Sequence, residues 1–174
     1  MKAGAFFAAA FALCLTAAPT LAIADSGGKD DTSTCPRGEA WDARQKKCVK
    51  VQGSVLPDKV LTDYAAALSK AGRYDEALTI LDLLKQPNTA EALNYRGFAT
   101  RKLGRVDEGI GYYLRSVSMD RRYAQVREYL GEAYVVKGDL ASAKAQLHAI
   151  KGICGTSCEQ YKHLAEAIAD PSKI

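Results

Sequence analysis

Two cysteines near the end of the chain, Cys154 and Cys158, are the side chains best suited to do chemistry. Three kinds of site use cysteines this close together: a redox dithiol, half of a metal site, or a disulfide. A catalytic dithiol normally has two intervening residues and follows a strand. A zinc site would recruit His148 and His163, the only histidines, because cysteine and histidine both bind zinc. The cysteines by themselves leave these alternatives open.

The first 24 residues predict a secretory signal peptide. Lys2 is the only charge before Asp25, the run between them is mostly Ala, Phe and Leu, and residues 22–24 read Ala-Ile-Ala. A basic start, an apolar core and a small-x-small end are typical of such a leader. Two threonines and a proline interrupt the roughly 20 apolar residues that a spanning helix needs. We expect cleavage after Ala24, a periplasmic or secreted product, and no transmembrane anchor.

Export makes the remaining cysteines informative. Cleavage leaves Cys35, Cys48, Cys154 and Cys158, and an even number in an oxidising compartment predicts disulfides. Four cysteines allow three pairings, and their order favours Cys35 with Cys48 and Cys154 with Cys158. The net charge of +4 is too small to indicate nucleic acid, and we expect no nucleic-acid partner.

Residues 25–57 predict a flexible leader and a small loop closed by Cys35 and Cys48. The enclosed segment, PRGEAWDARQKK, contains turn-forming Pro and Gly and the only tryptophan, Trp41. Closing it should stabilise the loop by about 3 kcal/mol. Trp41 either anchors a partner or packs against its own loop or the next segment.

Three glycines, Gly72, Gly104 and Gly138, recur 32 and 34 residues apart. A period in this range indicates a helical solenoid. Apolar residues three and four apart precede and follow each glycine, which predicts two helices per unit; the second stretch of the first unit runs to Leu84. No segment of comparable length alternates as a strand would, so the sequence predicts an all-α fold.

The units resemble the tetratricopeptide repeat, a helix–turn–helix of 34 residues. The matching features are a small residue midway along the first helix, an aromatic residue after it, a GRYDEA turn at 72–77, and an alanine early in the second helix: Ala65, Gly97, Gly131, Tyr134, Ala77 and Ala143. The resemblance implies a short right-handed α-solenoid of units 58–89, 90–123 and 124–157. Gly109 departs from the expected alanine, and Arg121 from the expected proline.

A last amphipathic stretch, 158–170, predicts a capping helix, because a solenoid must cover its open end. Its apolar stripe is Tyr161, Leu164, Ala165 and Ile168. Thr156 lies three residues before Glu159, the spacing of a capping box. Cys154 and Cys158 would then join the cap to the third unit as a disulfide.

Nothing in the sequence predicts catalysis, a cofactor or a metal, so we expect no enzyme. The resemblance implies that a protein or peptide partner binds in a groove along the first helices of the units. The groove positions carry Lys59, Thr62, Ala66, Asn94, Phe98, Arg101, Lys102, Glu128 and Glu132. Phe98 is either an exposed apolar contact or a core residue. The slots of the family's carboxylate clamp carry other residues, Thr62, Ala66, Tyr95, Gln125 and Tyr129, so that clamp is absent. The competing hypothesis is a thiol redox or metal-handling protein that uses Cys154 and Cys158.

Overall fold

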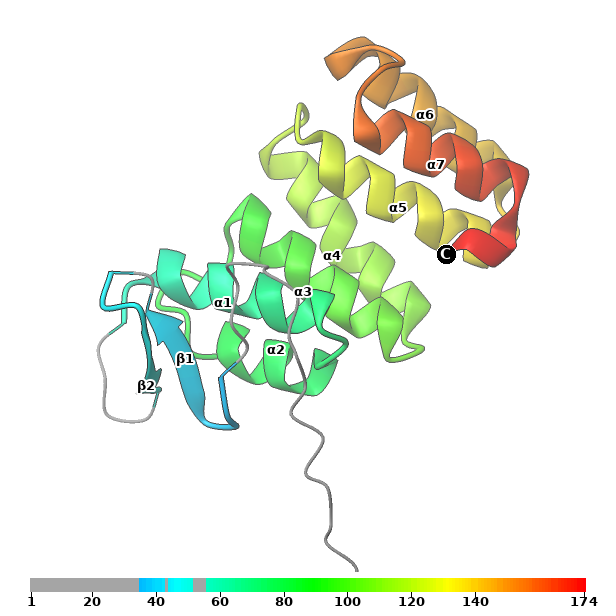
Figure 1. The fold of residues 1–174 in the computed structure, drawn as a ribbon. Helices are drawn as coiled ribbons and strands as arrows, with labels where there is room; N and C mark the ends of the chain where they lie inside the picture. Colours follow the sequence, from blue (N-terminus) through cyan, green and yellow to red (C-terminus); the bar gives the residue numbers. More distant parts are fainter. Residues whose placement is uncertain (1–34, 43, 52–55) are drawn as a thin grey trace, which may run out of the picture. The chain divides into compact units, whose positions relative to one another are not determined.

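The computed structural model describes residues 35–42, 44–51 and 56–174. The predicted signal peptide and residues 25–34 lie outside the described residues. The described chain forms a two-stranded hairpin followed by α-helices (Figure 1). None of the described helices has the length and apolar character needed to cross a membrane.

The helices form three successive antiparallel pairs and one final helix. Their bounds are α1 Asp58–Lys70, α2 Tyr74–Leu81, α3 Ala90–Lys102, α4 Val106–Met119, α5 Ala124–Val136, α6 Leu140–Cys154 and α7 Glu159–Ala169, followed by a 3-10 turn at Pro171–Lys173. Within each pair the two helices pack together, and each pair packs on the next. The predicted all-α solenoid is confirmed.

The three repeat glycines end the first helix of each pair. Their φ angles are 75°, 86° and 77° for Gly72, Gly104 and Gly138, a left-handed conformation that glycine adopts without a side-chain clash. In each turn the amide after the glycine donates to a carbonyl five residues back, as from Arg73 to Leu68 at 2.9 Å. This bond pattern terminates a helix and reverses the chain.

A pair of facing glycines explains one departure from the repeat pattern. A Cβ on Gly109 would lie 2.9 Å from the carbonyl oxygen of Gly97 and 3.0 Å from Cβ of Arg101. A Cβ on Gly97 would lie 2.7 Å from the ring of Tyr113, which is fully buried. Helices α3 and α4 therefore approach too closely for the alanine expected at Gly109.

Helix α2 is shorter than the sequence pattern indicated. It ends at Leu81, and Leu84 lies buried in the following turn instead of on the helix. The Asp58 carboxylate accepts hydrogen bonds from the amides of Lys85 and Gln86, at 3.1 and 2.8 Å. Pro87 further disfavours helix at the residue before it.

The expectation that the chain contains no strand was wrong for the disulfide-closed loop. Strands β1, Glu39–Asp42, and β2, Lys47–Lys50, pair antiparallel with Trp41 opposite Cys48. Four-residue strands are too short for alternation to identify them. The Asp42 carboxylate accepts from the amide of Arg44 at 2.8 Å, a side-chain turn between the strands.

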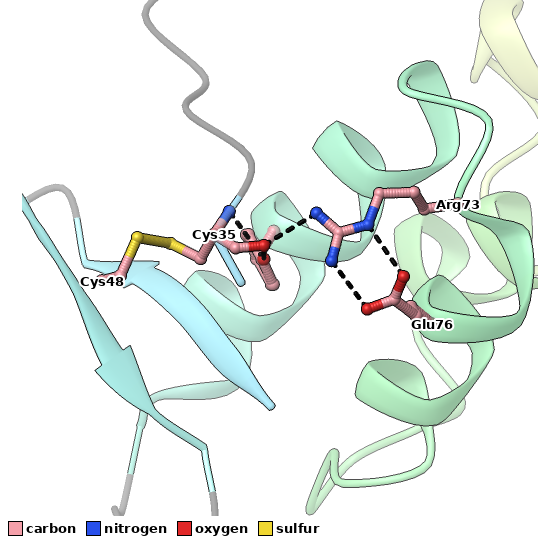
Figure 2. Close-up of a disulfide and its surroundings, with 5 residues drawn as sticks. Cys35, Cys48, Arg73 and Glu76 are labelled. Carbon is pink, nitrogen blue, oxygen red and sulfur yellow. Dashed lines mark hydrogen bonds and ion pairs between the residues drawn. A yellow bond between two sulfur atoms is a disulfide. The ribbon is translucent and has the colours of Figure 1, made fainter. Parts of the chain in front are cut away.

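The hairpin is held to the first helix pair by its disulfide cysteine (Figure 2). The Cys35 amide donates to the Tyr64 hydroxyl at 3.0 Å, and Arg73 Nη1 donates to the Cys35 carbonyl at 2.7 Å. Glu76 accepts two bonds from the same guanidinium, at 2.8 and 2.7 Å. Trp41 is half-buried and packs against this core. The hairpin therefore covers the first pair, and Trp41 belongs to that contact.

Helix α7 packs on α5 and α6 at the other end. Leu164 of α7 is fully buried and packs against Gly131 of α5. A disulfide joins Cys154, the last residue of α6, to Cys158, the N-cap of α7. The predicted capping box is wrong, because α7 begins at Glu159 and no side chain caps it. The corner is instead formed by Gly155, with φ of 79°, and the disulfide.

Candidate functional site

Side chains of the first helices and of α7 meet on one face, which we call the shared face. These side-chain contacts join α1 to α3, α3 to α5, and α5 to α7. The cross-helix pairs are Lys59–Glu91, Phe98–Tyr129, Arg101–Glu132 and Glu128–His163. The predicted groove residues lie on α1, α3 and α5, and several of them form these pairs. Thr62 and Asn94 are buried, Ala66 is half-buried, and Lys102 is exposed.

A buried ion pair links α3 to α5. Arg101 Nη2 lies 2.6 Å from Glu132 Oε2, and the two side chains are 3% and 15% exposed. Arg101 Nε also donates to the Tyr113 hydroxyl at 3.4 Å. The two predicted groove charges therefore neutralise each other, and Arg101 has little surface left for a ligand.

Phe98 is both a core residue and a partly exposed apolar residue, the two alternatives that the sequence left open. Its ring stacks at a tilt on Tyr129, with 4.8 Å between centroids, and meets the edge of Tyr74 at 6.2 Å. The ring is nevertheless only half-buried. Lys102 Nζ lies 5.8 Å from its centroid, within the range of a cation–π contact. Phe98 thus packs against the core and is partly exposed, with the Arg101 guanidinium also 5.6 Å from its centroid.

A chain of polar groups runs beside this aromatic pair. Asn94 Nδ2 donates to the Tyr123 hydroxyl at 3.3 Å, which donates to Gln125 at 3.1 Å, and Gln125 donates to the Tyr129 hydroxyl at 3.1 Å. Burial, followed by nearby Glu128, raises the pKa of Tyr129 to about 12, so this hydroxyl stays neutral. Sequence reasoning missed Tyr123 as a site residue and used Tyr129 only to exclude the clamp.

Glu128 is the site's most perturbed carboxyl. It is 7% exposed, and its Oε1 lies 2.9 Å from Nδ1 of His163 on α7. Burial, with smaller contributions from Glu132 and Glu159, raises the pKa of Glu128 to about 7, and His163 opposes that rise. The sequence suggested His163 as a zinc ligand and gave no sign of its contact with Glu128. His148 is exposed on α6.

The cysteines that thiol or metal chemistry would use are paired in the described chain. Cys154 and Cys158 form a disulfide, as do Cys35 and Cys48, in the predicted pairing. In that state no thiolate is available as a nucleophile or ligand. Within the described ranges, no group of three or more His, Cys, Asp and Glu side chains is placed to hold a metal ion.

Stacked helical hairpins whose first helices share one face define a helical-repeat protein. Two solved structures similar to this chain are tetratricopeptide-repeat domains, which confirms the resemblance at the level of fold. No protein-family profile and no curated protein sequence matches the chain.

Three solved structures illustrate this likeness, each at a sequence identity that shows the fold alone. The first TPR domain of human RPAP3 is 20% identical, with a TM-score of 0.55, 67% of this chain and 94% of that chain covered. The Yersinia enterocolitica type III secretion chaperone SycD, in complex with a peptide of the translocator YopD, is 19% identical, with a TM-score of 0.53, 67% and 92% covered. The first TPR of Spaghetti (RPAP3), bound to the HSP90 peptide SRMEEVD, is 17% identical, with a TM-score of 0.55, 69% and 99% covered.

Proposed function

We propose that this chain is a non-catalytic interaction module that binds a segment of a partner protein on its shared face. The observation that carries the proposal is the half-buried Phe98–Tyr129 pair, which leaves aromatic surface open beside Lys102. Partly exposed aromatic side chains are typical binding anchors, because they offer a large contact area at low entropic cost. The peptide complexes of SycD and Spaghetti are consistent with this role for the fold.

The module is proposed to act as a scaffold in the bacterial envelope, in the periplasm or as a secreted protein. The predicted signal peptide and two disulfides support this location, since disulfides persist in oxidising compartments. Sequencing the N-terminus of the protein from a periplasmic fraction should give Asp25 first. Mass spectrometry after thiol blocking should detect no free thiol, whereas a redox or metal-handling role requires Cys154 and Cys158 as thiols.

Site-specific crosslinking tests the interaction role. A photoreactive amino acid replaces Ala66 or Lys102 on the shared face, or Leu114, which is exposed on the outer helix α4. We expect the same partner to be crosslinked in intact cells from the two shared-face positions and not from Leu114. Crosslinks of equal yield from Leu114, or none from Ala66 and Lys102, would contradict the proposal.

A further inference from the structure

We propose that the bound segment carries a large apolar side chain and, two residues away from it, an acidic side chain. This inference rests on the proposed function and names the chemistry of the ligand. The apolar side chain would lie on Phe98, and the acidic side chain would pair with Lys102.

The apolar half of this subsite is the exposed part of the Phe98 ring. Tyr129 and Tyr74 support the ring at centroid distances of 4.8 and 6.2 Å, so its orientation is set by the protein before a ligand arrives. A preorganised ring costs little entropy when it is covered. An apolar or aromatic side chain would complete the burial of Phe98.

The charged half is Lys102, whose ammonium group has no carboxylate partner among the described residues. No ion pair joins Lys102 to any of them, and the contact that it does form is with the Phe98 ring at 5.8 Å. The neighbouring charges cancel, because Arg101 and Glu132 pair with each other. Desolvation by the surrounding protein, followed by repulsion from Arg101, lowers the pKa of Lys102, and attraction to Glu132 opposes that shift.

The distance between the two halves sets the spacing in the ligand. Lys102 Nζ is 5.8 Å from the Phe98 centroid, and an extended chain advances about 3.3 Å per residue. Because successive side chains of an extended chain point to opposite faces, an apolar residue and an acidic residue two positions apart reach both groups at once. The acidic side chain of the ligand supplies the carboxylate that pairs with the Lys102 ammonium group. The ligand therefore needs no free C-terminus.

Blocked peptides test this chemistry directly. The probes are N-acetylated, C-amidated nine-residue peptides with a central Phe, Leu or Ala, followed at the second position by Glu, Gln or Lys. Their affinity for the disulfide-intact protein is measured by fluorescence polarisation. We expect Phe–Glu and Leu–Glu peptides to bind about tenfold more tightly than their Gln counterparts, and the Ala peptides to bind most weakly.

Variants of Lys102 identify the responsible group. Lys102→Gln should reduce the preference for Glu over Gln to less than about twofold, and Lys102→Glu should prefer the Lys peptides. Lys144→Gln, which changes an exposed lysine on the outer helix α6, is the matched control and should leave the preference unchanged.

The inference would be overturned by equal binding of Glu and Gln peptides, or by an undiminished preference in Lys102→Gln. Absence of binding by every probe would overturn it as well, because the set contains the proposed ligand. These outcomes leave the proposed function to be decided by the crosslinking experiment in cells.

Discussion

Arg101 on α3 and Glu132 on α5 form an ion pair of 2.6 Å that joins the shared faces of the second and third helix pairs. Both residues were predicted as groove contacts, and 31 positions separate them in the chain. Their pairing assigns them a structural role, which can be measured as stability.

Removing one member of this pair should destabilise the fold. Arg101→Met should lower the free energy of unfolding in urea by about 3 kcal/mol, because the Glu132 carboxylate remains mostly buried without its partner. The double variant Arg101→Met/Glu132→Leu should recover most of that loss. Arg105→Met, which breaks the exposed pair with Glu108, is the control and should cost less than about 1 kcal/mol. A double variant no more stable than the single one would contradict the role of the pair.

Stability should fall as the pH rises from 5 to 8 because of Glu128. Burial raises its pKa from 4.5 to about 7 in the folded chain, so the folded state binds a proton more tightly than the unfolded state. This contribution is complete below pH 4.5 and is lost as the pH passes about 7, with a total on the order of 3 kcal/mol.

Urea unfolding of Glu128→Gln across this pH range checks that prediction. The variant should lose most of the slope and be more stable than the parent protein at pH 8. Glu166→Gln, at an exposed position of α7, should keep the slope. His163→Ala should shift the midpoint of the slope to higher pH, because the His163 hydrogen bond lowers the pKa of Glu128. An unchanged slope in Glu128→Gln would assign the pH dependence to other groups.

Gly131→Ala should destabilise the contact between α5 and α7. The added Cβ would lie 2.4 Å from Leu164 Cδ2, inside a packed core, and overpacking of this kind costs about 1–3 kcal/mol. Leu164→Ala removes the clashing atoms, so the double variant should lose less stability than the sum of the two single variants. Gly152→Ala, with no atom within 4 Å of its new Cβ, should instead stabilise α6 by about 0.5–1 kcal/mol. Additive effects at Gly131 and Leu164 would contradict a clash between them as the cause of the loss.

The two disulfides should differ in their effect. The Cys35–Cys48 disulfide closes the larger loop, with a separation of 13 residues, whereas Cys154 and Cys158 are 4 residues apart. Replacing Cys35 and Cys48 by serine should therefore lower the free energy of unfolding by about 3 kcal/mol, and replacing Cys154 and Cys158 by about 2 kcal/mol. Opening the hairpin should also change the fluorescence of Trp41, which packs against the first helix pair. Fluorescence-monitored urea unfolding measures both effects. Unaltered Trp41 emission after opening would show that the disulfide does not hold the hairpin in place.

Local sequence signals predicted most of the fold but not the hairpin. The repeat glycines end helices because their left-handed turns depend on neighbouring residues only, and the amphipathic stretches mark both helices of each pair. The strands at 39–42 and 47–50 are too short to show a period, and contacts of Cys35 with Tyr64 and Arg73 hold them in place.

The sequence predicted which positions form the candidate site, but it did not predict which of these side chains contact one another. The resemblance to the repeat placed Phe98 and Lys102 on one helix, but whether Phe98 faces Tyr129 or solvent depends on how α3 and α5 pack. His163 was missed for the same reason, because its partner Glu128 lies 35 residues earlier in the chain.

The sequence by itself determined the helical pairs, their turns and the positions that line the first helices, because these features follow from periodicity and from glycine's backbone freedom. Only the tertiary structure decided which of those side chains already have a partner within the protein. Arg101, Glu132 and Glu128 have partners on neighbouring helices, whereas Lys102 lacks a carboxylate among the described residues. The physical reason is that the partners of these charges lie 31 and 35 residues away in the chain, so the packing of the helices sets which side chains come within reach.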